Sequence, residues 1–219
     1  MVEYKEKWNK YKKGKVKWIN SRREHPSRDK FVDFVKHNHS ESSILEIGGG
    51  ELIEASMISS LLPKVQYNVV DISDFFLENC KKVKGIKAHK GDMTDLPFHN
   101  KEFDLVYMSS VLEHSPDIIK TIGEISRVSH SFYFSLFKWK MQSGNLKSEY
   151  QTKKKYFSTS FNIDALLGLI GEYGDIKESV ICFEDGSGEE DFLSYREKFD
   201  LDNHRTSDYL MISGLWNSE

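Results

Sequence analysis

The sequence has little cysteine and no long apolar run, and these absences exclude several classes of protein. Its 219 residues include only two cysteines, Cys80 and Cys182, which are far apart and lack metal-ligand spacing. This excludes a disulfide-rich secreted domain and indicates a reduced, intracellular protein, which we expect to be cytoplasmic. No run approaches the roughly 18 apolar residues that a membrane span needs, and the first residues lack the apolar core of a signal peptide. We therefore expect no membrane association.

Charge is present in quantity but is unevenly distributed. The net charge is −3, whereas residues 1–40 hold 12 Lys/Arg and 5 Asp/Glu, a net of +7, which leaves −10 for the rest. Aromatic residues lie among these lysines, so we expect a basic N-terminal arm and helix over 1–40 that packs against the main domain, 41–219. Such an arm can attract anionic substrates, nucleic acid included, although a solvated helix face is the alternative.

Strand-like and helix-like segments alternate along the main domain. We expect helices over 51–62 and 73–83, another that begins at Ser115 or Asp117, and one over 161–170. The expected strands are 44–47, 65–70, 86–89, 103–108, 131–137, 176–183 and 209–216. Alternation of this kind implies right-handed crossovers and a mostly parallel sheet, which is an α/β fold. The polar segment 138–160 is expected to pass over the active edge of the sheet.

Three consecutive glycines follow the first expected strand. The apolar run from Ser43 ends at Glu46 and Ile47 and then turns through Gly48 to Gly50 into a helix. Glycine suits positive φ and close approach of a ligand, and the N-terminus of the following helix suits an anionic group. The dinucleotide-binding pattern G-x-G-x-x-G is incomplete here. A strand-to-helix turn without a ligand is therefore the alternative interpretation of the glycines alone.

Acidic residues lie at or near the ends of the first three expected strands. Glu46 is in the first, Asp71 ends the second and Asp92 follows the third. A carboxylate at the end of the second strand can accept two hydrogen bonds from a ribose diol. Asp92 could accept a hydrogen bond from the amino group of an adenine. Either acid alone could instead form a loop or a helix cap, but both together after a glycine turn favour a nucleoside-containing cofactor.

The sequence at this point resembles the class I S-adenosylmethionine-dependent methyltransferases, from about Ser43 to Phe137. Four segments carry the resemblance: ILEIGGG at 44–50, VVDI at 69–72, GDMTDLPF at 91–98 and FDLVYMSSVLEH at 103–114. The resemblance implies a Rossmann-like three-layer sandwich whose seven-stranded sheet has the order 3-2-1-4-5-7-6, with an antiparallel last strand. It also implies S-adenosylmethionine as cofactor, S-adenosylhomocysteine as product, and no metal.

The resemblance also implies roles for individual residues. Gly48, Gly49 and Gly50 would pass beneath the methionine part of the cofactor, and Glu46 would orient its amino group. Asp71 would bind the ribose, Ile72 would pack on the adenine, and Asp92 with Met93 would contact the adenine edge. Met108 and Ser109 would lie beside the methionine end. One departure is Leu52, which stands where the family often has a third glycine.

The acceptor side is less defined. His114 is the candidate base for a hydroxyl acceptor and Glu113 is its substitute; either could instead be structural. The substrate-binding candidates come from the basic segment: Tyr11, Trp18, Arg22, Arg23 and Arg28. His37 and His39 lack an identifiable third ligand, so we do not expect a metal site there.

Two classes of function follow. The first is methyl transfer to a small polar acceptor, foremost an oxygen of a sugar, glycan or related metabolite, by a monomer or homodimer. RNA, favoured by the basic segment, or protein are the alternative acceptors. The second class is a non-catalytic scaffold that binds the cofactor.

Overall fold

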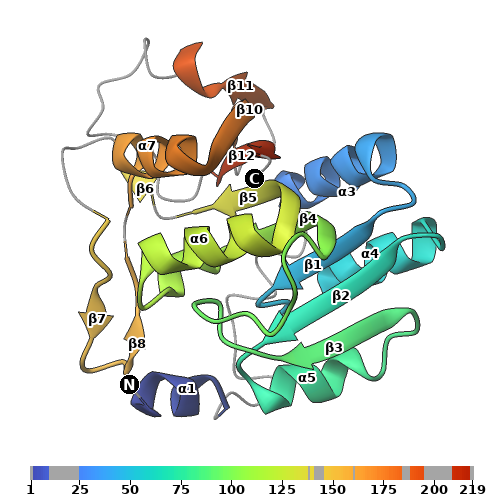
Figure 1. Ribbon diagram of the computed structural model, residues 1–219, viewed down its shortest axis with the longest axis horizontal. Coiled ribbons are helices and arrows are strands. Elements are labelled where there is room, and N and C mark those ends of the chain that lie inside the picture. Colours follow the sequence, from blue (N-terminus) through green and yellow to red (C-terminus); the bar gives the residue numbers. More distant parts are fainter. Residues whose placement is uncertain are drawn as a thin grey trace.

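A computed structural model describes residues 2–9, 25–137, 139–140, 146–159, 161–183, 188–194 and 209–217. Its centre is an eight-stranded sheet of order β11-β10-β12-β5-β4-β1-β2-β3 (Figure 1). The strands of this sheet are β1 Ser43–Ile47, β2 Gln66–Asp71, β3 Ile86–Lys90, β4 Phe103–Ser109, β5 Ser129–Leu136, β10 Gly174–Cys182, β11 Glu189–Asp191 and β12 Tyr209–Trp216.

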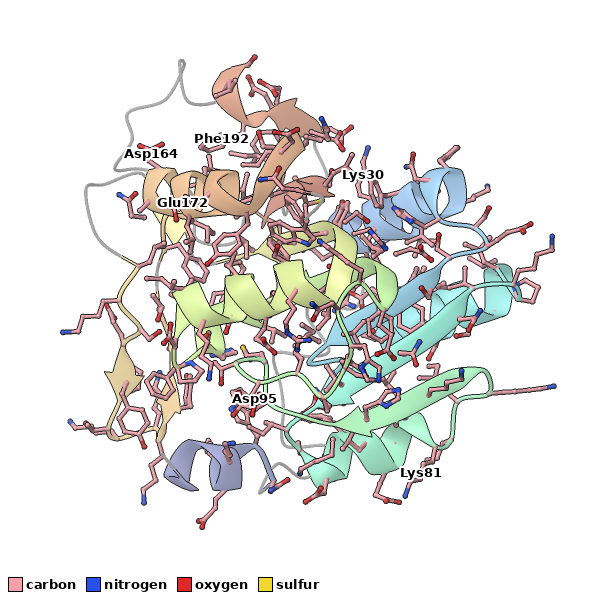
Figure 2. All side chains as sticks on the ribbon, in the orientation of Figure 1. Lys30, Lys81, Asp95, Asp164, Glu172 and Phe192 are labelled. Carbon is pink, nitrogen blue, oxygen red and sulfur yellow. The ribbon has the colours of Figure 1, made fainter. Side chains whose placement is uncertain are left out.

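The directions of the strands agree with the sequence-based expectation. β1, β2, β3, β4 and β5 are parallel, whereas β12 runs antiparallel to both β5 and β10. The seven expected strands therefore have the expected order, and the antiparallel last strand is confirmed. The edge strand β11, which pairs with β10, was not expected. It is followed by Phe192, labelled in Figure 2, whose fully buried ring joins the core beneath α7.

Helices cover both faces of the sheet and complete three layers (Figure 1). On one face lie α6 Ile118–Val128 and α7 Ile163–Tyr173; on the other lie α3 Pro26–Asn38, α4 Ile53–Leu61 and α5 Asp74–Cys80. Neighbouring strand residues alternate between the two cores, because successive side chains of a strand point to opposite faces. Leu45 belongs to the core beneath α6 and α7, and Ile44 to the core beneath α3 and α4.

Side-chain caps explain several helix starts. The carboxylate of Asp117 accepts a hydrogen bond from the Lys120 amide, which selects Asp117 as the cap of α6. Asn162 caps α7 in the same way, through the Ala165 amide, so the helix begins two residues later than expected. Ser73 precedes α5, but its hydroxyl donates to the Trp8 carbonyl 3.0 Å away instead of capping the helix.

Two peripheral elements meet beside the carboxyl ends of the parallel strands. The helix α1, Val2–Asn9, contacts β8, Tyr156–Phe157, which forms a hairpin with β7, Tyr150–Gln151 (Figure 1). A second small pairing joins β6, Trp139–Lys140, to β9, Phe161–Asn162. The part of segment 138–160 that the structure describes thus passes over the expected edge of the sheet. Among the described residues, no helix is long and apolar enough to span a membrane.

Candidate active site

A cavity opens at the carboxyl ends of β1, β2 and β4, where the crossovers to the helices begin. Topology explains its place, since the loops that follow parallel strands meet at this edge of the sheet. Most of the residues implied by the family resemblance line this cavity, and so does His114, the candidate base. The implied residues are Glu46, Gly48, Gly49, Gly50, Asp71, Ile72, Asp92, Met93 and Ser109. The cavity is therefore the candidate site for the cofactor and for the reaction.

The glycine turn forms one wall of the cavity. Gly48 and Gly50 have φ of +71° and +53°, a region that side chains disfavour. A Cβ at Gly48 would lie 2.8 Å from both γ-carbons of Val111, which is too close for a real contact. A Cβ at Gly50 would instead have only the Gly48 carbonyl oxygen near it, at 3.9 Å. The turn is thus packed tightly behind Gly48 and is open at Gly50.

Leu52, at the position of the missing third glycine, adopts a left-handed conformation with φ 60° and ψ 36°. Its side chain is only 2% exposed and belongs to the core beneath α3 and α4. The backbone therefore keeps the conformation that a glycine would take without strain, and burial of the leucine offsets the strain.

Asp71 ends β2 with its carboxylate fixed by the backbone. Its Oδ1 accepts a hydrogen bond of 2.7 Å from the Ser73 amide, and the amides of Gly50 and Ile72 also bond to the carboxylate. Burial raises its pKa from 3.8 to about 6, and the amides and Lys90 only partly oppose this increase. Asp71 is therefore ionised at neutral pH and is oriented toward the cavity it lines.

Asp92 follows β3 and lines the same cavity as the glycine turn. Its Oδ1 accepts hydrogen bonds from the amide and hydroxyl of Thr94, at 3.0 and 2.9 Å. Its other oxygen pairs with Lys5 of α1 at 2.8 Å. Part of the basic N-terminal segment thus reaches the cavity, as expected, but Lys5 was not among the substrate-binding candidates.

Glu46 belongs to a buried cluster of ionisable side chains at the base of the cavity. Its Oε2 accepts a hydrogen bond of 3.0 Å from the Tyr67 hydroxyl. Nearby, Glu54 of α4 accepts from the Tyr107 hydroxyl at 3.2 Å and pairs with Arg28 at 2.5 Å. Both glutamates are under 5% exposed, and both line the cavity. Sequence reasoning missed Glu54, although an acid in the first turn of an otherwise apolar helix was a visible signal.

His114 is part of an aromatic wall. Its ring centroid lies 5.0 Å from that of Trp8 on α1 and 5.4 Å from that of Tyr156 on β8. Its Nδ1 lies 2.8 Å from the Phe157 carbonyl oxygen. A carbonyl only accepts hydrogen bonds, so Nδ1 carries a proton, and in the neutral tautomer Nε2 is then the acceptor nitrogen of the ring. Trp8 lines the cavity beside His114.

Two of the predicted site residues do not line the cavity: Glu113, the substitute base, and Met108, which the resemblance implied. Glu113 is fully buried, and its Oε1 accepts a hydrogen bond of 2.9 Å from the Phe137 amide, which joins the end of β5 to the loop after β4. Met108 is fully buried in the core beneath α6. Both positions favour structural roles.

The cavity wall includes two residues that sequence reasoning missed. Ser110 lines the cavity with a φ of 55°, and its hydroxyl donates to that of Tyr209 at 3.3 Å. Tyr209 starts β12, and no local pattern connects it to the loop after β4. Of the substrate-binding candidates, Arg28 lines the cavity. The other four lie outside the described residues: Tyr11, Trp18, Arg22 and Arg23.

The two histidines considered for metal binding have local partners. The Nδ1 of His37 lies 2.7 Å from the Asp33 carbonyl oxygen, and that of His39 lies 3.2 Å from the Ser42 hydroxyl. Within the described ranges, no group of three or more His, Cys, Asp or Glu could hold a metal ion.

Comparison with known proteins gives matches to methyltransferases. The family profile described as a methyltransferase domain matches residues 45–131. Malonyl-[acyl-carrier protein] O-methyltransferase of Legionella pneumophila is 30% identical over 89 residues, which are 39% of this chain and 31% of that protein. The chain therefore aligns with about a third of the length of this curated relative.

Solved structures support the fold over a longer range. A Thermotoga maritima methyltransferase, described as a possible histamine N-methyltransferase, superposes with a TM-score of 0.64 at 17% identity, covering 96% of this chain and 98% of that one. The Burkholderia thailandensis 1,6-didemethyltoxoflavin-N1-methyltransferase also gives a TM-score of 0.64, at 13% identity, covering 92% of this chain and 81% of that one. Together with the strand order, these structures show that the chain has the Rossmann-like fold of the class I S-adenosylmethionine-dependent methyltransferases, and its residues 45–131 match the methyltransferase-domain family.

Proposed function

We propose that the chain transfers the methyl group of S-adenosylmethionine to an oxygen of a small polar acceptor, such as a hydroxyl of a sugar or glycan. The observation that carries the proposal is the single space lined by the glycine turn, Asp71, Asp92 and His114. The methyl group of a sulfonium is already activated, so the reaction needs in-line positioning of the acceptor more than covalent catalysis.

The cofactor would lie along the carboxyl ends of β1 and β2. Asp71, ionised at neutral pH, would accept hydrogen bonds from the ribose hydroxyls, while Ile72, Asp92 and Met93 would hold the adenine. Gly50 leaves room for the methionine end, which Glu46 would orient and Ser109 would flank. The Burkholderia relative was solved with S-adenosylhomocysteine bound, which supports the same cofactor here.

His114 would act as the base that removes the hydroxyl proton of the acceptor. The hydrogen bond from Nδ1 to the Phe157 carbonyl fixes the ring and leaves Nε2 as the basic atom. Trp8 and Tyr156 hold the other sides of the ring. α1 and the β7–β8 hairpin contact His114 through Trp8 and Tyr156, and the enclosure by these side chains supports a small acceptor over a folded macromolecule. Glu113 is the weaker candidate for the base, because it is buried and its carboxylate accepts a hydrogen bond from the Phe137 amide.

The test is transfer of label from methyl-labelled S-adenosylmethionine to a panel of sugars, glycans, RNA and peptides, followed by mass spectrometry of the products. We expect an O-methylated small molecule, and a loss of about 10²–10⁴-fold in turnover for His114→Ala. His130→Ala, at an exposed histidine of β5, is the matched control. Turnover is expressed per folded molecule, so that a merely unstable variant is not counted as inactive.

The remaining outcomes separate the alternatives. Label in RNA or peptide alone would replace the small acceptor with a macromolecule. Cofactor binding without label transfer to any member of the panel would favour a non-catalytic scaffold.

A further inference from the structure

The cluster at the base of the cavity contains two buried carboxylates, although one glutamate would be enough to orient the amino group of the cofactor. Glu46 and Glu54 come from different elements, β1 and α4, and are 3% and 4% exposed. Both line the cavity, and Arg28 of α3 pairs with Glu54 rather than with Glu46. Two buried carboxylates beside one guanidinium are electrostatically unfavourable when both are ionised, because water does not screen them.

The groups that face Glu46 come from every element packed around it. They are Tyr67 and Asp71 of β2, Tyr107 of β4, Glu54 of α4, Arg28 of α3 and Cys80 of α5. Burial, followed by the charge of Glu54, raises the pKa of Glu46 well above its usual range, and Tyr67 and Arg28 only partly oppose this. Burial also raises the pKa of the Cys80 thiol to about 12, so this thiol stays neutral. Without a ligand, a proton on Glu46 is therefore the least costly way to relieve the repulsion.

Binding of a cofactor of the S-adenosylmethionine type changes which form of Glu46 is favoured, because the methionine part of the cofactor carries an ammonium group. An ammonium beside Glu46 favours the ionised carboxylate, to which the Tyr67 hydroxyl already donates a hydrogen bond. The carboxyl proton would then leave to solvent, and a carboxylate–ammonium pair would replace the neutral acid.

We propose that cofactor binding at this site is coupled to the release of a proton from Glu46, and that Glu54 is a positioning residue whose charge sets the pH range of this exchange. The proposal rests on the proposed cofactor site and deepens it. Its consequence is a pH-dependent affinity for any ligand with an ammonium at the methionine end, while ligands that lack the amino acid part bind independently of Glu46. Affinity rises with pH, by up to about tenfold per pH unit where one proton is released per molecule bound.

Titration calorimetry in buffers of different ionisation enthalpy counts the protons released. The probes are S-adenosylhomocysteine, which has the ammonium group, and 5′-methylthioadenosine, which has the adenosine part but no ammonium. Asp71 has a pKa of about 6 and would contact the ribose that both probes share, so subtracting the second probe removes its contribution. Over a series of pH values we expect S-adenosylhomocysteine to release more protons than 5′-methylthioadenosine, by at most one per molecule bound.

Three variants assign the proton. Glu46→Gln should abolish the difference between the probes. Glu54→Gln keeps an acceptor for the Tyr107 hydroxyl but removes the charge, so the pH dependence should move to lower pH; a merely structural Glu54 would change stability and leave that range in place. Glu124→Gln removes a carboxylate that pairs with Arg127 at 2.8 Å and does not line the cavity, so it should leave the count unchanged.

The comparison of the two probes on the wild-type protein tests the coupled proton release even if a variant fails to fold. Equal proton release with the two probes would overturn the inference while leaving the cofactor site intact. Absence of binding by both probes would overturn the proposed function itself. Proton release that persists undiminished in Glu46→Gln would place the exchange on another group and contradict the assignment.

Discussion

The indole of Trp8 lies against the imidazole of His114, with ring centroids 5.0 Å apart. This contact joins the N-terminal helix to the loop after β4 and places both rings in the wall of the cavity. The same helix also reaches Asp92, with which Lys5 pairs, and α5, where the side chain of Asn9 accepts a hydrogen bond from the Asp74 amide. Helix α1 therefore contacts both the proposed adenine-binding residue Asp92 and the proposed base His114.

Truncation of Trp8 is expected to weaken cofactor retention more than it weakens the fold. Trp8→Ala removes ring contacts with His114 and Tyr156, each worth about 0.5–1.5 kcal/mol. The affinity for S-adenosylhomocysteine should fall roughly 3–10-fold, while the melting temperature changes little because α1 lies outside both core clusters. Tyr150→Ala is the control for calorimetry. Tyr150 is an aromatic residue of β7, in the same β7–β8 hairpin as Tyr156, and does not line the cavity. Equal losses for both variants would contradict a specific role for Trp8.

A methyl group at Gly50 should block the cofactor without disrupting the turn. Gly50→Ala introduces a Cβ with open space on the protein side and a left-handed backbone, at a strain of about 1–2 kcal/mol. Gly85→Ala has the same kind of strain, with φ +87° and no atom nearer than 3.9 Å, but lies outside the cavity. The two variants should melt alike, and only Gly50→Ala should lose binding of S-adenosylhomocysteine. Wild-type affinity in Gly50→Ala would show that the ligand lies elsewhere.

Replacement of Asp71 should affect stability and binding in opposite directions. Burial raises the pKa of Asp71 from 3.8 to about 6, so its ionisation costs stability above about pH 6 and nothing below about pH 4. Asp71→Asn should therefore stabilise the free protein at pH 7.5, by at most about 3 kcal/mol, with no gain at pH 4. It should weaken binding of S-adenosylhomocysteine by roughly 1.5–3 kcal/mol, the range for charged hydrogen bonds. Thermal melts at both pH values and calorimetry at pH 7.5 measure the two effects; unchanged affinity would remove the ribose assignment.

The sequence predicted the parts of the site that depend on local pattern. The strand ends at Glu46 and Asp71, the glycine turn and the loop at Asp92 each leave a signal within a few residues, and a parallel sheet brings strand ends together. It did not predict Glu54, Ser110 or Tyr209, because their place in the cavity depends on contacts between α4, the loop after β4 and β12. β11 was missed for a similar reason, since a three-residue acidic strand has no pattern of its own and forms only by pairing with β10.

Leu52 shows why the absence of the third motif glycine was a weak argument against a cofactor-binding turn. The left-handed turn persists without glycine because the leucine side chain is buried. Leu52→Gly should relieve about 1–2 kcal/mol of strain but lose about 2–5 kcal/mol of burial, giving a net destabilisation of up to about 4 kcal/mol with little change in cofactor affinity. Lys155→Gly, at an exposed residue with the same φ of 60°, loses no burial and is the control in chemical denaturation. A stabilised Leu52→Gly would show that strain outweighs burial.

The most direct test of the account is a crystal structure of the protein with S-adenosylhomocysteine. The account predicts the ligand in the cavity at the carboxyl ends of β1 and β2, with its ribose hydroxyls on the Asp71 carboxylate and its amino group beside Glu46. The sulfur should face the space next to His114. Electron density for the ligand at another surface, or a cavity that stays empty at saturating ligand, would contradict the cofactor site and the function proposed from it.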